Sequence, residues 1–140
     1  MWDARTGKHV KRFRHYSEPY KEYDTSSTNA VAFSADSKFV LVAGRGRNTR
    51  SGYYSRAHLW DTSNYKLIRT FPIENKDIAK VSFSADNKFI IVGNRGGQVT
   101  KLEVSTGEQA MSFDVGTSGY FKFDFSADGN YAIAVNGGNR

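Results

Sequence analysis

Two segments of the sequence concentrate residue types that bind anionic partners. Residues 44–56 contain four arginines and no acid, and residues 14–28 contain three tyrosines among mixed charges. A planar guanidinium forms paired hydrogen bonds with a carboxylate or a phosphate, and tyrosine adds contact area at a small cost in side-chain entropy. Both residue types are enriched at binding hot spots. The candidate binding residues are Arg45, Arg47, Arg50, Tyr53, Tyr54, Arg56, Tyr20, Lys21, Tyr23 and Arg95.

No catalytic or metal-binding pattern accompanies these residues. The three histidines, His9, His15 and His58, occupy unrelated positions and lack the spacing of metal ligands. The glycine groups at 44–46 and 94–97 each link two expected strands, so we interpret them as turns without the helix N-terminus that holds a phosphate. The absence of cysteine excludes disulfides and thiolate metal sites. We therefore expect no enzyme activity, no metal and no cofactor.

The composition is that of one modest folded domain. Of the 140 residues, 39% are hydrophobic and 14% aromatic, which is enough to bury a core. There is no apolar run long enough to span a membrane, so we expect no membrane partner. The net charge of +6, from 20 Lys and Arg against 14 Asp and Glu, favours acidic or phosphate-bearing partners where it is clustered. This composition indicates no particular compartment.

One tetrapeptide, Phe-Ser-Ala-Asp, recurs at residues 33–36, 83–86 and 125–128. Before each occurrence apolar residues alternate with polar ones, and this period of two indicates a strand. After each occurrence comes a nearly continuous apolar run, which indicates a strand covered on both faces. Ser and Asp bond nearby backbone groups in turns. We therefore interpret each unit as a strand, a tight turn and a second strand, with the aspartate as a turn residue.

A second repeated element alternates with the first. The dipeptides Trp2-Asp3 and Trp60-Asp61 occupy equivalent positions, with Leu102 at the third. Together with Phe-Ser-Ala-Asp, this pattern resembles the WD40-repeat family along the whole chain. The resemblance implies an all-β chain that is a segment of a WD40-type β-propeller with four-stranded antiparallel blades. Gly96 and Leu102 stand where the family usually has Asp and Trp, so we expect the blades to depend on apolar packing.

The repeat divides the single domain, residues 1–140, into parts of blades. The expected parts are the end of one blade at 1–13, full blades at 29–71 and 78–113, and the first half of a blade at 120–135. Together they amount to three blades, whereas a closed propeller has four to eight. We interpret the chain as an excerpt of a longer propeller, because Met1 falls within a strand. The alternative is self-association, in which open edges of two chains close a six-bladed ring.

The first full blade carries two insertions. Trp2 to Trp60 spans 58 residues, whereas Trp60 to Leu102 spans 42, the ordinary repeat length. The extra residues divide equally between 14–28 and 44–56, two connections that lie at the same end of an antiparallel meander. By the resemblance this end is the top face, where many WD40 propellers bind peptides, and Arg95 belongs to a neighbouring loop there.

We therefore expect a protein-interaction scaffold that binds an acidic or phosphorylated partner segment through these Arg and Tyr loops. The first alternative is nucleic-acid binding by the same patch, with Arg on phosphates and Tyr stacked on bases. A propeller enzyme whose site lies in other blades is a further alternative. A second basic run, at residues 8–12, lies on an expected outer strand, where we interpret it as protection of a sheet edge.

Overall fold

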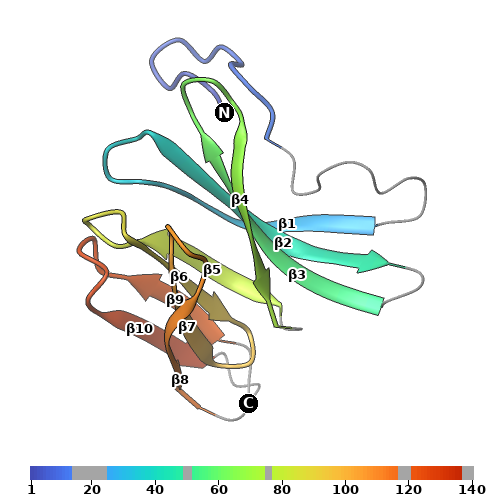
Figure 1. Cartoon of the computed structure of the whole chain (residues 1–140), viewed down its shortest axis with the longest axis vertical. Helices are drawn as coiled ribbons and strands as arrows, with labels where there is room; N and C mark the ends of the chain where they lie inside the picture. Colours follow the sequence, from blue (N-terminus) through green and yellow to red (C-terminus); the bar gives the residue numbers. More distant parts are fainter. Residues whose placement is uncertain (14–24, 49–51, 75–76, 117–120, 137–140) are drawn as a thin grey trace.

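The computed structural model describes residues 1–13, 25–48, 52–74, 77–116 and 121–136, which contain three antiparallel sheets (Figure 1). Sheet I contains, in spatial order, β1 (Thr25–Phe33), β2 (Phe39–Asn48), β3 (Gly52–Asp61) and β4 (Leu67–Ile73). Sheet II contains β5 (Ile78–Phe83), β6 (Phe89–Asn94), β7 (Gln98–Glu103) and β8 (Gln109–Asp114). Sheet III is the pair β9 (Phe121–Phe125) and β10 (Ala132–Asn136).

The prediction of an all-β chain with four-stranded antiparallel sheets is confirmed. In sheets I and II each strand pairs with the strand that follows it in the sequence, so both sheets are meanders joined by hairpins. Within the described ranges, no helix is long and apolar enough to cross a membrane.

The sheets are arranged so that their first strands lie side by side. β1 contacts β5, and β5 contacts β9, while the later strands of sheets I and II follow in sequence order away from this line (Figure 1). Sheet II therefore lies between the other two, and each of its faces meets a neighbouring sheet.

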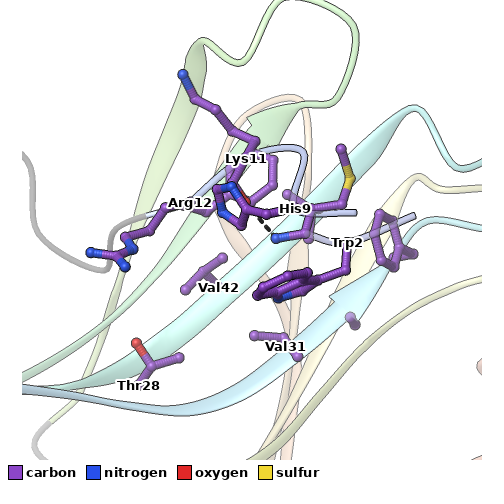
Figure 2. A pocket seen from close by; sticks show the side chains of 12 residues that line it. Trp2, His9, Lys11, Arg12, Thr28, Val31 and Val42 are labelled. Atoms are coloured by element: carbon purple, nitrogen blue, oxygen red, sulfur yellow. Dashed lines mark hydrogen bonds between the residues drawn. The ribbon is translucent and has the colours of Figure 1, made fainter. Parts of the chain in front are cut away.

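The hairpin formed by residues 1–13 lies against the face of sheet I that points away from sheet II. Trp2 and His9 form its one bridge, and the Phe13 ring lies 5.9 Å from the Trp60 ring. Between this hairpin and strands β1 and β2 is a groove of about 510 Å³. Figure 2 shows the Trp2 ring above Val31 and beside Val42, and both valines belong to the apolar wall of the groove.

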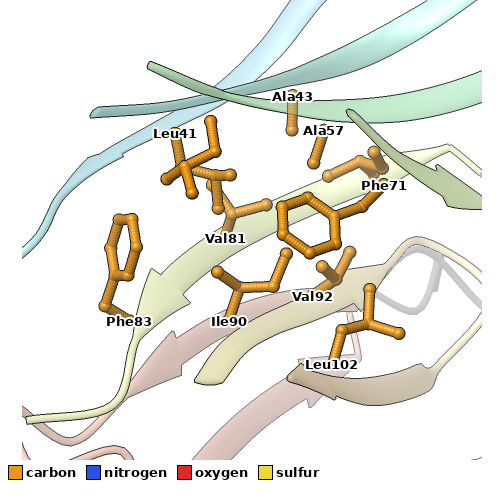
Figure 3. Close-up of a cluster of buried hydrophobic side chains, with 11 residues drawn as sticks. Leu41, Ala43, Ala57, Phe71, Val81, Phe83, Ile90, Val92 and Leu102 are labelled. Atoms are coloured by element: carbon orange, nitrogen blue, oxygen red, sulfur yellow. The ribbon is translucent and has the colours of Figure 1, made fainter. Parts of the chain in front are cut away.

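The main core fills the space between sheets I and II. Leu41 from β2 and Phe71 from β4 meet Ile90 and Val92 from β6, and all four side chains are almost fully buried (Figure 3). Ile91, between the last two in sequence, points the other way and packs with sheet III in a second cluster. Successive strand residues point to opposite faces, so the continuous apolar run at 89–93 serves both cores, as its composition predicts.

Each Phe-Ser-Ala-Asp segment builds the same turn. Between β5 and β6 the Ser84 hydroxyl donates to Asp86 Oδ1 (2.7 Å), and the Lys88 amide donates to the same oxygen (3.0 Å). The Phe89 amide in turn donates to Ser84 Oγ (3.0 Å). Asn87 has a φ of 58°, the left-handed conformation that asparagine and glycine adopt most readily. The aspartate is therefore a structural residue of the turn.

Replacing Ser84 with alanine is expected to raise the pKa of the Asp86 carboxyl. Donation from the Ser84 hydroxyl, followed by donation from the Lys88 amide, holds this pKa below its ordinary value of 3.8. A lowered pKa in the folded state stabilises the fold at pH values above 3.8, and this stabilisation is lost as the pH falls through the folded-state value. Carboxyl titration by NMR should show the increase at Asp86, while Asp36 in the equivalent turn keeps its pKa. An unchanged Asp86 pKa would contradict this account of the turn.

The second insertion differs from its prediction. Residues 44–48 and 52–56, predicted as a loop, lengthen β2 and β3 into one long hairpin. Their register is continuous from Phe39 opposite Asp61 to Asn48 opposite Gly52. The prediction is wrong because glycine favours turns but does not exclude strands, and Gly-Arg-Gly-Arg also has the period-two alternation of a strand. The first insertion also differs in its last part, because residues 25–28, predicted as loop, form the start of β1 and pair Thr25 with Arg47.

Candidate functional site

The register of the long hairpin sorts its arginines and tyrosines onto two faces. Arg47 lies opposite Tyr53, and Arg45 lies two residues away on the same strand. Directly opposed residues of an antiparallel pair share a face, as do residues two apart. These three side chains therefore lie on one face of the hairpin, which we call the Arg–Tyr face. Tyr54 and Arg56 lie on the reverse face.

Arg45 makes the closest side-chain contacts on the Arg–Tyr face. Its Nη1 donates to Asp77 Oδ1 at 2.8 Å, and its guanidinium carbon lies 3.9 Å from the centroid of the Tyr53 ring. Asp77 precedes β5, so this ion pair joins the extension of sheet I to the end of sheet II. Both partners are about one-third exposed, and a pair with that much solvent contributes only about 0 to 1 kcal/mol to stability. Its main effect is to orient the guanidinium.

Arg47 continues the same face outward. It is exposed, and its guanidinium carbon lies 5.5 Å from the centroid of the Tyr53 ring, so that ring lies within reach of two cations. Tyr53 itself is 55% exposed. The Arg–Tyr face therefore offers solvent a positive charge beside an accessible aromatic ring.

The reverse face explains the two glycines of the hairpin. The Tyr54 ring lies across Gly46, where an added Cβ would collide with the ring. A Cβ on Gly44 would collide with the Ser27 carbonyl oxygen, beside an irregularity in the pairing of β1 with β2. The guanidinium carbon of Arg56 lies 4.6 Å from the centroid of the Tyr54 ring. The glycines thus let an aromatic ring and a neighbouring strand approach β2, and they do not form a turn.

The predicted residues divide into four groups. Arg45, Arg47 and Tyr53 come together on the Arg–Tyr face, whereas Tyr54 and Arg56 point to the reverse face. Arg95 is exposed in the turn between β6 and β7, and its amide donates to the Asp77 carbonyl oxygen at 2.8 Å, which places it beside the Arg45–Asp77 pair. The remaining predicted residues lie outside the described ranges, and they are Arg50, Tyr20, Lys21 and Tyr23.

Sequence reasoning missed Asp77. It lies 32 residues from Arg45, and no motif connects them. The topology could have indicated the pair. Asp77 lies just before the first strand of sheet II, Arg45 lies near the connection between the second and third strands of sheet I, and these two connections are at the same end of adjacent sheets. By contrast, the glycine group at 94–97 is a turn as predicted, with Asn94 Oδ1 accepting from the Gly96 amide (2.9 Å) and Gly97 at a φ of 90°.

The surroundings of His58, the buried histidine of β3, are those of a structural residue. His58 is 1% exposed, and its Nδ1 lies 2.9 Å from the Thr70 hydroxyl on β4. In the part of the chain that the structure describes, no group of three or more His, Cys, Asp and Glu side chains could hold a metal ion.

No protein-family model matches the chain, and comparison with the curated proteins finds no match.

Proposed function

We propose that this chain is a binding module of the WD40 β-propeller type, and that its Arg–Tyr face holds an acidic or phosphorylated segment of a partner protein. Three features support the propeller assignment: the alternating repeat, the first strands side by side, and the strand order away from them. In this assignment the sheets are blades, and the Arg–Tyr face lies at their top end.

The observation that carries the binding proposal is the placement of Arg45, Arg47 and Tyr53 on one face. The ion pair with Asp77 restrains Arg45 before any ligand arrives, which lowers the entropy lost on binding. On the Arg–Tyr face the guanidinium groups of Arg45 and Arg47 carry two positive charges, and the Asp77 carboxylate that Arg45 contacts offsets one of them. A carboxylate or phosphate can accept from the guanidinium edges while an apolar neighbour packs on Tyr53.

A peptide fits this surface better than a nucleic acid does. Stacking of successive bases needs several exposed rings along a basic groove. On the Arg–Tyr face Tyr53 is the one aromatic ring among the described residues, since Tyr54 turns to the reverse face and packs over Gly46. One ring between arginines suits a single acidic or phosphorylated side chain with its neighbours.

Binding of fluorescent probes tests the proposal. A phosphoserine peptide rich in glutamate is expected to bind, its serine and glutamine counterpart is not, and oligo(dT) should bind more weakly than the phosphopeptide. The salt series separates the alternatives, because binding through many phosphates falls about 10³-fold or more between about 50 and about 200 mM salt. If oligo(dT) binds more tightly than the phosphopeptide and shows this steep salt dependence, the nucleic-acid alternative is favoured. If neither the phosphopeptide nor oligo(dT) binds, both the peptide proposal and the nucleic-acid alternative are refuted.

A further inference from the structure

The amino-terminal hairpin has the geometry of the last two strands of a sheet. Trp2 pairs with His9, seven residues later, and Leu102 of β7 pairs with Gln109 of β8 at the same spacing. The turn hydrogen bonds also coincide: in both hairpins a glycine amide donates at 2.8 Å to the carbonyl of an acidic residue four positions earlier. Residues 1–13 are therefore a third instance of the turn that ends sheets I and II.

Sheet III has the geometry of the first two strands. Ala132 pairs with Phe125 as Ile90 pairs with Phe83 in sheet II. Sheet III and the amino-terminal hairpin lie at opposite ends of the molecule (Figure 1). The described residues thus hold two complete sheets and, at the two ends, the complementary halves of a third.

Each end also exposes one apolar face. In sheet II, Val81 and Phe83 pack against sheet I and are 1% and 4% exposed. Their equivalents on β1, Val31 and Phe33, are 63% and 54% exposed and line the groove beside the hairpin (Figure 2). We call Val31 and Phe33 the β1 face; Val40 and Val42 of β2 line the same groove but are already buried, at 5% and 4% exposed.

The other end exposes the opposite kind of face. Leu41 of β2 and Ile91 of β6 pack against the sheet that follows and are at most 4% exposed. Their equivalent on β10, Ile133, is 64% exposed, and Tyr131 and Val135 on the same side are 75% and 54% exposed. We call Tyr131, Ile133 and Val135 the β10 face. Exposed apolar patches of this kind mark interaction surfaces.

We infer that the occupant of the groove is sheet III of a second copy of this chain, which packs its β10 face on the β1 face. The same two kinds of face already meet twice within the molecule, between sheets I and II and between sheets II and III. The chain therefore contains its own template for the contact. The β1 face and the β10 face differ, so the contact is head to tail, and it can close with two copies if the rotation permits.

The internal register also predicts the seam. In sheet II, Ile90 of β6 pairs with Leu102 of β7. The equivalent residues are Ala132 of one copy and Trp2 of the other, so these two are expected to pair across the contact. Each copy supplies two complete sheets and two halves, and two copies then hold six sheets, within the range that closes a ring.

Size-exclusion chromatography with light scattering tests the inference on the 140-residue chain. The chain is expected to be a dimer, and Ile133→Glu on the β10 face and Val31→Glu on the β1 face should each give a folded monomer. Ile68→Glu is the matched control, because Ile68 is 49% exposed on β4 and belongs to neither face. A monomeric wild-type chain overturns the inference, as does a Val31→Glu variant that remains dimeric, which would indicate contact between two β10 faces.

Disulfide trapping tests the register, and the absence of native cysteine makes it clean. Paired residues of antiparallel strands have Cα atoms about 4.5 to 5.5 Å apart, a distance that a disulfide spans. The Trp2→Cys, Ala132→Cys double variant should therefore form a covalent dimer on oxidation, and the Trp2→Cys, Ala134→Cys variant should not. A disulfide within one chain, or equal trapping in both variants, overturns the predicted seam. The outcome is independent of ligand binding at the Arg–Tyr face, which the peptide probes report separately.

Discussion

Phe71→Ala is expected to lower the free energy of unfolding by about 3 to 5 kcal/mol, the usual cost of truncating a fully buried phenylalanine. Phe71 is 0% exposed and packs in the cluster between sheets I and II with Ala57 and Val92 (Figure 3). Its removal takes away apolar burial and leaves a cavity that the strands of two hydrogen-bonded sheets cannot collapse to fill. Urea unfolding followed by circular dichroism measures the change.

Ile68→Ala is the control on the same strand. Ile68 is 49% exposed, so its truncation is expected to cost about 1 kcal/mol or less. Two large apolar residues of β4 are thereby compared at different burial. Similar losses for the two variants would contradict the placement of the main core between sheets I and II.

Replacing Arg45 and Arg47 together with glutamine is expected to weaken binding of the phosphoserine probe at least tenfold, about 1.4 kcal/mol. Each arginine is expected to make a charge-assisted hydrogen bond to the ligand, and such bonds contribute about 1.5 to 3 kcal/mol each. Neither side chain belongs to the apolar cores, so the fold should survive the double substitution. Fluorescence anisotropy measures the affinity, and a thermal melt checks folding.

The control removes the same charge from the other end of the sheets. Lys38 and Lys88 lie in the turns that precede β2 and β6, their side chains are about three-quarters exposed, and each makes only a 3.9 Å contact with a turn aspartate. Glutamine at both positions should leave the affinity nearly unchanged. Equal weakening by the two double variants would mean that only net charge matters. If neither pair changes binding, the partner binds elsewhere.

The two arginines are expected to contribute differently. Arg45 already has a carboxylate partner in Asp77, so a ligand must share its guanidinium with that acid. Arg47 is exposed and stacked only loosely, at 5.5 Å from the Tyr53 centroid. We therefore expect Arg45 to position the Tyr53 ring at the edge of the proposed site, and Arg47 to supply the charge that a ligand meets first.

The residue types of the candidate site were predictable from the sequence, but its secondary structure was not. Arginine and tyrosine spacing indicated a basic, aromatic surface at 44–56, and three of those residues do meet on one face. The predicted loop is a strand pair, however, so period-two alternation sends Tyr54 and Arg56 to the reverse face. Asp77 lies beside Arg45 because sheets I and II pack together, and no local pattern in the sequence indicates that packing.

By itself, the sequence determined the tight Phe-Ser-Ala-Asp turns and the strands that flank each of them. Strand periodicity and turn chemistry are local: alternation follows from the pleat, and the Ser84–Asp86 turn is made by residues within five positions of one another. The tertiary structure alone decided which equivalent residues are buried. Phe83 and Phe33 occupy the same place in the repeat, yet one is 4% and the other 54% exposed, because a sheet covers the first and a groove lies beside the second. Burial depends on the neighbour across the face, and that neighbour is distant in the sequence.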